Sequence, residues 1–138
     1  FLNDYYSTPD SWTVTTAGQK VLTALNRWLY NRADTHMQDH KGYVSTLSIL
    51  IIKSNTAHIF HVGDSRIYRL REGALEQLTT DHSAALRGEQ VHLTRAMGMD
   101  IKLGIDYKKA DVLAGDLFFL STDGVHDFID SRFLRIYN

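Results

Sequence analysis

The stretch GDSRIYRLREGALEQLTTDHS, residues 63–83, carries the clearest structural pattern in the sequence. Apolar and polar side chains alternate from Ile67 to Leu70, a Glu72-Gly73 turn follows, and an apolar pattern resumes from Leu75 to Leu78. Alternation with a period of two predicts strands, and a short turn between two such runs predicts an antiparallel pair. The stretch therefore indicates a sheet made of short strands that follow one another in the chain.

More strands are expected on both sides of this stretch. Residues 44–52 are almost continuously apolar, which is typical of a strand buried on both faces. Residues 57–62 predict a second strand, joined to the first by a Ser54-Asn55 turn, so that the chain would form an antiparallel meander. Residues 105–113 and 116–121 predict two further strands.

Helices are predicted where the apolar residues change to a spacing of three and four. Residues 17–34 form an amphipathic pattern, and Thr16 and Gln19 at its start have capping-box spacing. Residues 1–16 read as a loop, 83–97 as a short helix with a loop, and 125–135 as the beginning of a helix. Trp12 and Trp28 are expected in the core. The prediction is an α+β fold, in which antiparallel sheets are flanked by helices.

Composition limits the classes of function. With 138 residues the chain is expected to form one domain, and its net charge of −1 gives no electrostatic basis for binding nucleic acid or an anionic membrane. The absence of cysteine excludes disulfides and thiolate ligands and fits a reducing compartment, so we expect a cytoplasmic protein. No apolar run approaches the roughly 20 residues of a membrane helix, so no membrane segment is predicted.

Two aspartates stand at matching places, each beside a glycine and after an apolar run. Asp64 follows Gly63, and Asp123 precedes Gly124. The glycines would let the backbone turn sharply or approach a ligand closely. Carboxylates presented by neighbouring strands suit a hard cation such as Mg²⁺ or Mn²⁺, but Asp-Gly and Asp-Ser are also common in turns. The pattern alone leaves both interpretations open.

Four motifs in chain order closely resemble those of the metal-dependent Ser/Thr protein phosphatases, the type 2C or PPM family. They are the 63–83 stretch with its GDSR and Asp-His ends, LTRAMG (93–98), Gly-Asp (115–116) and STDG (121–124). Residues 42–47 are similar to the family's approach to the same sheet. The resemblance covers residues 17–130 and points to the bacterial branch of the family.

The resemblance implies an α-β-β-α sandwich with a dinuclear metal centre at one edge of the stacked sheets. It makes Asp123 a direct metal ligand, while Asp64 would help hold a further, weaker ion. Two or three Mn²⁺ or Mg²⁺ ions are then expected in the complete domain. Two of them would acidify a bridging water that attacks the phosphorus of a phosphoserine or phosphothreonine. A phosphoprotein substrate is the expected partner, and a fused or cognate protein kinase is a candidate partner.

Other motifs of the family are expected outside this sequence. The family's phosphate-binding arginine, an acidic residue and an Asp-Gly turn would precede Phe1, and its closing Asp-Asn pair would follow Asn138. We therefore expect residues 1–138 to form a single, incomplete catalytic domain, with little or no turnover on its own.

Two other functions compete with this one. A haloacid-dehalogenase-type phosphatase also has an aspartate and a glycine after an apolar strand. Ser121 stands where that mechanism requires a nucleophilic aspartate, and a serine cannot form the acyl-phosphate. A catalytically silent phosphatase-like module, which binds a partner or a single cation weakly, is the alternative of a different class.

The other polar residues are expected to be structural. His36 and His40 suit a solvated helix end better than a metal pair, because no third ligand is evident. His58 and His61 lie three residues apart on a strand, hence on opposite faces, and cannot share an ion. The remaining expectations are an ion pair for Arg66, a loop contact for His82, and a place at the start of a helix for Asp127.

Overall fold

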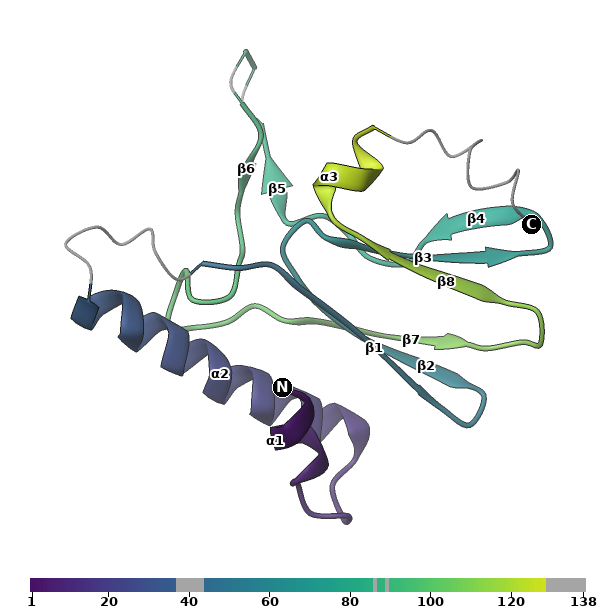
Figure 1. Ribbon diagram of the computed structural model, residues 1–138, viewed down its shortest axis with the longest axis horizontal. Helices are drawn as coiled ribbons and strands as arrows, with labels where there is room; N and C mark the ends of the chain where they lie inside the picture. The colour runs from purple at the N-terminus through teal and green to yellow at the C-terminus, as the bar shows by residue number, and fades with distance from the viewer. Residues whose placement is uncertain (37–43, 86, 89, 129–138) are drawn as a thin grey trace.

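The computed structural model describes residues 1–36, 44–85, 87–88 and 90–128, and it stacks one helix on two sheets (Figure 1). The first sheet has the strand order β1-β2-β7 and the second β4-β3-β8. The first sheet comprises β1 (Leu47–Lys53), β2 (Thr56–Val62) and β7 (Asp106–Asp111). The second comprises β3 (Arg66–Arg71), β4 (Ala74–Gln77) and β8 (Leu117–Ser121). Helix α2 (Val14–His36) covers the outer face of the first sheet. The predicted α+β fold is confirmed.

The strand pairs are all antiparallel, but the chain does not form one meander. The β1–β2 hairpin turns at Ser54-Asn55, as predicted, because Lys53 pairs with Thr56. The Glu72-Gly73 turn likewise joins β3 to β4. Between β2 and β3, however, the chain leaves the first sheet and enters the second. The break at 63–65 is therefore a crossing between layers rather than a hairpin turn.

Strand β2 lies at the centre of the first sheet and is buried on both faces. Phe60 and Val62 belong to the core against α2, whereas Ile59 belongs to a second core between the sheets, with Ile67 and Leu78. The prediction of two buried faces for residues 44–52 was wrong. β1 is an edge strand whose residues are half-buried or exposed. The continuous apolar run therefore belongs to the strand beside the central strand β2, and not to the central strand itself.

A glycine sets the distance between α2 and the sheet. A Cβ atom on Gly18 would lie 2.3 Å from Cζ of Phe60, a separation that real structures do not show. Gly18 therefore costs some helix propensity but lets α2 sit directly on the ring of Phe60, which is fully buried. Truncating a buried phenylalanine such as Phe60 to alanine typically costs about 3–5 kcal/mol.

Helix α2 begins earlier than the sequence pattern indicated. The Thr13 hydroxyl oxygen accepts a hydrogen bond from the Thr16 N–H at 3.1 Å, so Thr13 caps a helix that starts at Val14. The preceding segment, predicted as a loop, contains the short helix α1 (Leu2–Tyr6).

Neither tryptophan is in the core. Trp12 is 38% exposed and Trp28 53% exposed, which corrects the prediction made from their apolar character. Each ring lies under a cation instead, Lys20 over Trp12 and Arg32 over Trp28, with the charged group 5.2 Å from the ring centroid in both cases. Charged side chains of α2 therefore cover the faces of both aromatic rings.

Two predicted helices differ in the structure. The described residues of 83–97 contain no helix and instead pair as β5 (Ser83–Ala84) and β6 (His92–Leu93). Helix α3 (Asp123–His126) begins two residues before the predicted 125, while 129–135 lie outside the described residues. None of the described helices is long and apolar enough to cross a membrane.

Candidate metal centre

The two predicted ligands, Asp64 and Asp123, lie at the same end of the second sheet. The β3–β8 ladder ends with Arg66 opposite Ser121. Asp64 comes two residues before this last pair and Asp123 two residues after it, so continuing the antiparallel register would place the two aspartates opposite each other. The structure thus brings the two residues to one sheet end from positions 59 apart in the sequence.

Gly63 is required where the chain crosses between the sheets. Its φ of 110° is one that side-chain-bearing residues rarely adopt, and a Cβ there would lie 2.4 Å from Cγ2 of Thr46. Gly124 has no such requirement, because an added Cβ would approach nothing closer than the Thr122 hydroxyl at 3.8 Å. The expectation of a glycine-dependent turn is confirmed at Gly63 only.

The carboxylates of the two aspartates are little engaged by the protein. Asp64 is half-buried, and its carboxylate has no hydrogen bond or ion pair with another residue of the described part of the chain. Asp123 is exposed and accepts only the N–H of its neighbour Gly124, at 2.9 Å. Because these carboxylates have few partners in the described part of the chain, their oxygen atoms are available to a ligand.

The arginine next to this turn is fully occupied. The Arg66 guanidinium holds Asp81 through two nitrogens, with its shortest contact at 2.6 Å from Nη2 to Oδ2. This hydrogen bonding lowers the pKa of Asp81 and raises that of Arg66. The ion pair expected for Arg66 is confirmed, and its charge is neutralised by Asp81 rather than available for a phosphate group.

The buried residue His61 is linked by hydrogen bonds to the crossing at 63–65. His61 Nε2 donates to the Thr80 carbonyl at 3.1 Å, so its Nδ1 accepts from the Ser48 hydroxyl at 2.8 Å. The Ser48 oxygen also bonds the Ser65 hydroxyl at 2.8 Å, which links β1 and β2 to the turn. Burial lowers the pKa of His61, and the neighbouring His82 lowers it further. His61 is therefore a neutral, fully hydrogen-bonded core residue.

His82 makes the loop contact that was expected for it, and the contact is with the crossing itself. Its Nδ1 accepts the Gly63 N–H at 3.0 Å, and its backbone N–H donates to the Gly63 carbonyl at 2.8 Å. Its Nε2 lies 2.7 Å from Oδ2 of Asp106 on β7.

The other histidine and aspartate predictions have mixed outcomes. His58 bonds the Tyr107 hydroxyl, away from the partners of His61, so the two rings do face opposite sides. Asp127 follows α3 rather than beginning it, and Asp123 occupies the first turn instead. His40 lies outside the described residues, so the His36–His40 prediction is not tested.

One residue near the site was missed by sequence reasoning. His126 is nearly buried, with 6% of its side chain exposed, and its Nδ1 bonds the Ser121 hydroxyl at 3.0 Å. It therefore fixes the end of β8 directly before Asp123. Only its position three residues after Asp123 could have marked it, since that spacing places both on the same side of a helical turn.

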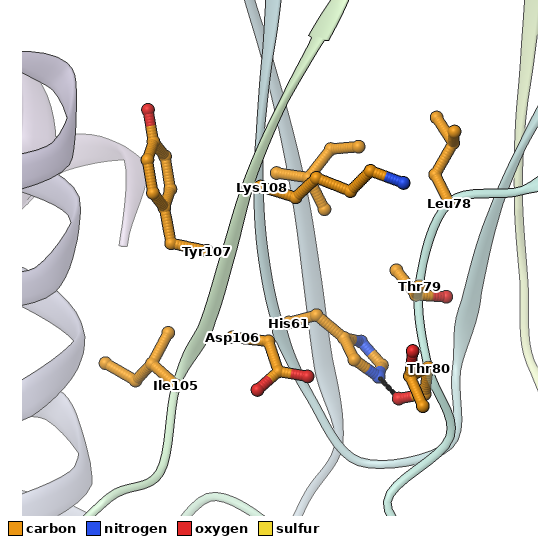
Figure 2. Close-up of a pocket in the computed structure, with 9 residues that line it drawn as sticks. His61, Leu78, Thr79, Thr80, Ile105, Asp106, Tyr107 and Lys108 are labelled. Carbon is orange, nitrogen blue, oxygen red and sulfur yellow. Dashed lines mark hydrogen bonds between the residues drawn. The ribbon is translucent and has the colours of Figure 1, made fainter.

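Two hollows flank the strands near this end. One, of about 290 Å³, adjoins the residues next to both aspartates and is lined by Thr46, Leu47, Ser48, Ser65, Arg66, Leu120, Ser121 and Thr122. The other, of about 380 Å³, lies between β7 and the 78–80 segment. Figure 2 shows His61 and Asp106 directed toward Thr79 and Thr80 in this second hollow, while Ile105 and Tyr107 point toward α2. The first hollow is the one beside the candidate ligands.

The donors present suit a hard cation but do not complete a site. Carboxylate oxygens are the ligands that Mg²⁺ and Mn²⁺ prefer. Among the described residues, however, no group of three or more histidine, aspartate or glutamate side chains converges on one point. Asp64 and Asp123 can therefore contribute to a metal centre without forming one alone.

A family model and several curated phosphatases match the chain. A family model described as protein phosphatase 2C matches residues 2–137. The protein phosphatase PhpP of Streptococcus pneumoniae serotype 2 is 28% identical over 111 residues, which cover 70% of this chain and 45% of PhpP. The serine/threonine phosphatase stp of Listeria innocua is 28% identical over 145 residues, with coverage of 87% and 57%. The chain thus spans about half the length of the curated relatives it matches.

Solved structures also share the fold. PppA, a regulatory component of the type VI secretion system in Pseudomonas aeruginosa, superposes with a TM-score of 0.82 at 28% identity, covering 98% of this chain and 62% of PppA. The catalytic domain of the serine/threonine protein phosphatase PstP, solved with two manganese ions, superposes with a TM-score of 0.79 at 20% identity, with coverage of 98% and 61%. At that identity the likeness to PstP shows the fold alone.

Proposed function

The chain belongs to the protein phosphatase 2C family, and from this we propose that its protein hydrolyses phosphoserine and phosphothreonine in other proteins with the aid of Mn²⁺ or Mg²⁺. The observation that carries the proposal is the placement of Asp64 and Asp123 at one sheet end. Each stands two residues beyond the last β3–β8 pair, and neither carboxylate is bound by a cationic side chain of the described part.

Asp123 and Asp64 would hold the metal, Asp123 as a direct ligand and Asp64 as a ligand to a further ion. A divalent ion bound there supplies a nucleophile near neutral pH by acidifying a coordinated water. The chain's own residues support this role in two ways. Arg66 and His82 hold the backbone on either side of Asp64, and the hollow of about 290 Å³ provides space next to the carboxylates.

A catalytically silent module of the same fold is the second candidate. It is favoured by one observation: the described residues hold no cluster of three or more metal-binding side chains. Such a module would bind a phosphoprotein or a single cation weakly, without turnover.

The test is a phosphatase assay on the 138-residue chain and on the product of the natural gene that contains it. Hydrolysis of p-nitrophenyl phosphate and of a phosphothreonine peptide is followed with Mn²⁺, with Mg²⁺ and with a chelator. We expect the gene product to turn over only with metal and to lose at least 100-fold in rate on Asp123→Asn, while the isolated chain shows little or no turnover. A gene product that binds the phosphopeptide but never hydrolyses it would establish the silent module instead.

The cellular setting follows from the same proposal. A phosphatase of this class acts on proteins that a kinase has modified, so a fused or cognate protein kinase is the partner we propose. A cytoplasmic location is proposed with it, supported by the absence of cysteine from the sequence. Fractionation of cells that express a tagged gene product tests the location.

A further inference from the structure

We propose that His82 is a positioning residue that holds the crossing at Gly63–Ser65, and with it the carboxylate of Asp64, through both nitrogens of its ring. This inference rests on the proposed role of Asp64 as a metal ligand, but its structural content concerns the protein without metal.

Gly63 is bound twice by the same residue. The His82 N–H donates to the Gly63 carbonyl at 2.8 Å, and the Gly63 N–H donates to His82 Nδ1 at 3.0 Å. The His82 residue is only 3% exposed, and its ring lies 4.8 Å from that of His61, centroid to centroid. Both polar groups of the glycine backbone are thus satisfied by one buried residue, directly before Asp64.

The tautomer of His82 is determined by its two partners. Because Nδ1 accepts a backbone N–H, it carries no proton, and the ring proton must be on Nε2. Nε2–H then donates to Oδ2 of Asp106 at 2.7 Å. A carboxylate in this position fixes both the tautomer and the orientation of an imidazole. Asp106 therefore acts on the crossing from the first sheet, through His82.

Asp106 is itself held by a third residue. Burial alone would raise the pKa of Asp106, but the hydrogen bonds from His82 and Arg95, together with the charge of Arg95, outweigh burial and lower it. Arg95 Nη1 lies 3.2 Å from Asp106 Oδ1 and 3.2 Å from the Gly104 carbonyl. The contacts run from the 95–104 segment through Asp106 and His82 to the backbone of Gly63.

The other side of Asp64 is held by the residue next to His82. Arg66 stands two residues after Asp64, and two of its side-chain nitrogens bind the carboxylate of Asp81. The dipeptide 81–82 therefore fixes the chain on both sides of Asp64, while the carboxylate between these anchors stays without a partner in the described part of the chain. Fixing the supports of a ligand while leaving the ligand itself open is what a preorganised site requires.

Two conservative variants separate positioning from packing. In His82→Asn the side-chain oxygen lies where Nδ1 was and keeps an acceptor for the Gly63 N–H. In His82→Gln the amide reaches toward Asp106 instead and leaves the Gly63 N–H without its acceptor. Both lose the imidazole ring, so a purely packing role predicts similar effects. His58→Gln, which removes a histidine on the opposite face of the same sheet, is the matched control.

The measurement is amide hydrogen exchange in the ¹⁵N-labelled chain, with Gly63 compared to Phe60 at the centre of the sheet. We expect His82→Gln to raise the exchange of Gly63 relative to Phe60 by about tenfold or more, and His82→Asn to stay within about threefold of the unmodified chain. In the unmodified chain, the ring nitrogen shifts should show the Nε2–H tautomer. Three results would each overturn the proposal: Gly63 exchange in His82→Gln equal to that of the unmodified chain, Gly63 exchange in His82→Asn as fast as in His82→Gln, or the Nδ1–H tautomer in the unmodified chain.

A manganese titration of the same samples connects this result to the metal. We expect the amide signal of Asp64 to broaden with Mn²⁺, with a midpoint at least about threefold higher in His82→Gln than in His82→Asn. Equal midpoints would overturn the link between His82 and the ligand. If the unmodified chain shows no broadening at Asp64 or Asp123, the proposed metal site fails, while the exchange data still decide whether His82 holds the crossing.

Discussion

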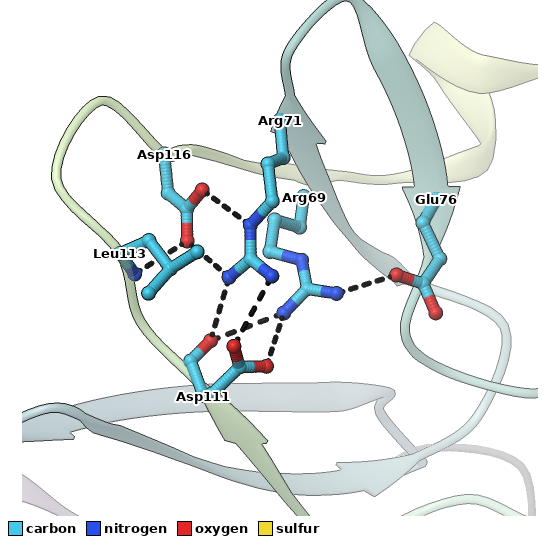
Figure 3. Close-up of polar contacts among 6 residues, drawn as sticks. All are labelled: Arg69, Arg71, Glu76, Asp111, Leu113 and Asp116. Atoms are coloured by element: carbon cyan, nitrogen blue, oxygen red, sulfur yellow. Dashed lines mark hydrogen bonds and ion pairs between the residues drawn. The ribbon is translucent and has the colours of Figure 1, made fainter.

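The two ends of the β3–β8 pair treat their acidic residues in opposite ways. At the end shown in Figure 3, three carboxylates have cationic partners: Arg71 binds Asp116 at 2.7 Å and Asp111 at 3.1 Å, and Arg69 binds Asp111 and Glu76. At the other end, Asp64 and Asp123 have none among the described residues. Of the three arginines on β3, Arg69 and Arg71 make the ion pairs at the first end, and Arg66 binds Asp81.

The comparison distinguishes acids that stabilise the fold from acids that are available for function. Asp116 accepts from Arg71 and from the Leu113 N–H, and its side chain is only 1% exposed. These contacts hold its pKa well below the usual range. They tie the connection between β7 and β8 to β3, and so join the two sheets. Asp64 makes no such connection within the described part of the chain.

The largest effect is expected from Asp116→Ala. The change leaves the Arg71 guanidinium without its closest partner and the Leu113 N–H without an acceptor. We expect the thermal midpoint to fall by about 10 °C. Asp116→Asn, which keeps an acceptor for Leu113, should lose less. A midpoint within about 2 °C of the unmodified chain, measured by circular dichroism, would show that the paired end does not stabilise the fold.

The second effect is loss of stability in acid. The pKa values of Asp81, Asp111 and Asp116 are lowered in the folded chain, so the unfolded chain binds protons first as the pH falls. The contribution of these carboxylates to the free energy of unfolding is fully present above about pH 4 and is lost below it. For each carboxylate, the unfolding constant rises by up to about tenfold per pH unit. Urea unfolding between pH 5 and 2.5 measures this slope, and Asp116→Asn should make it shallower.

Near the end of the sheet that carries Asp64, stability should depend on pH at a higher pH than it does for the paired carboxylates. Burial lowers the pKa of His61, so the unfolded chain binds a proton near pH 6.5 while the folded chain does not. Stability is then lost as the pH falls below about 6.5, by at most about tenfold in the unfolding constant per pH unit. His61→Gln should flatten the profile between pH 7 and 5. A profile unchanged by that substitution would assign the slope to another group.

A smaller effect is expected from manganese. If Asp64 and Asp123 bind Mn²⁺ in the folded chain only, an ion concentration of a few times the dissociation constant stabilises by about 1 kcal/mol. We expect the thermal midpoint to rise by about 3 °C in 5 mM MnCl₂. The double variant Asp64→Asn and Asp123→Asn should show no rise, whereas Asp116→Asn should keep it.

The smallest effect is expected from the same two aspartates without metal. Because neither carboxylate is paired, Asp64→Asn and Asp123→Asn should each change the free energy of unfolding by less than about 0.5 kcal/mol. Urea denaturation in the presence of a chelator measures this. A loss of more than about 2 kcal/mol from either would mean that the residue has a structural partner and that the two ends do not differ in kind.

The sequence predicted the strands and turns that show a local pattern, and it missed the features that depend on contacts between residues far apart in the chain. The strand runs, both hairpin turns and the ion pair of Arg66 follow from alternation, turn residues and motif. The division into two sheets could not be predicted from the pattern, because Gly63 looks like a turn residue whether the chain folds back or crosses. The exposure of Trp28 was missed because an aromatic at helical spacing reads as core even when a neighbouring arginine covers its face.

The candidate site shows the same division between local and distant information. Asp64 and Asp123 could be identified because each stands beside a glycine at the end of a recognisable run. Two residues that support them, Ser48 and Asp106, carry no local signal. Each acts through a partner that only the folded chain brings near: Ser48 through His61, 13 residues away, and Asp106 through His82, 24 residues away.

The double burial of β2 has a consequence for how the chain unfolds. Its even-numbered residues Phe60 and Val62 belong to the helix-facing core, and its odd-numbered Ile59 belongs to the core between the sheets. Neither core can be exposed without removing the strand that the other requires. The helical layer and the second sheet should therefore melt as one cooperative unit, so that probes of α2 and of β8 report the same transition.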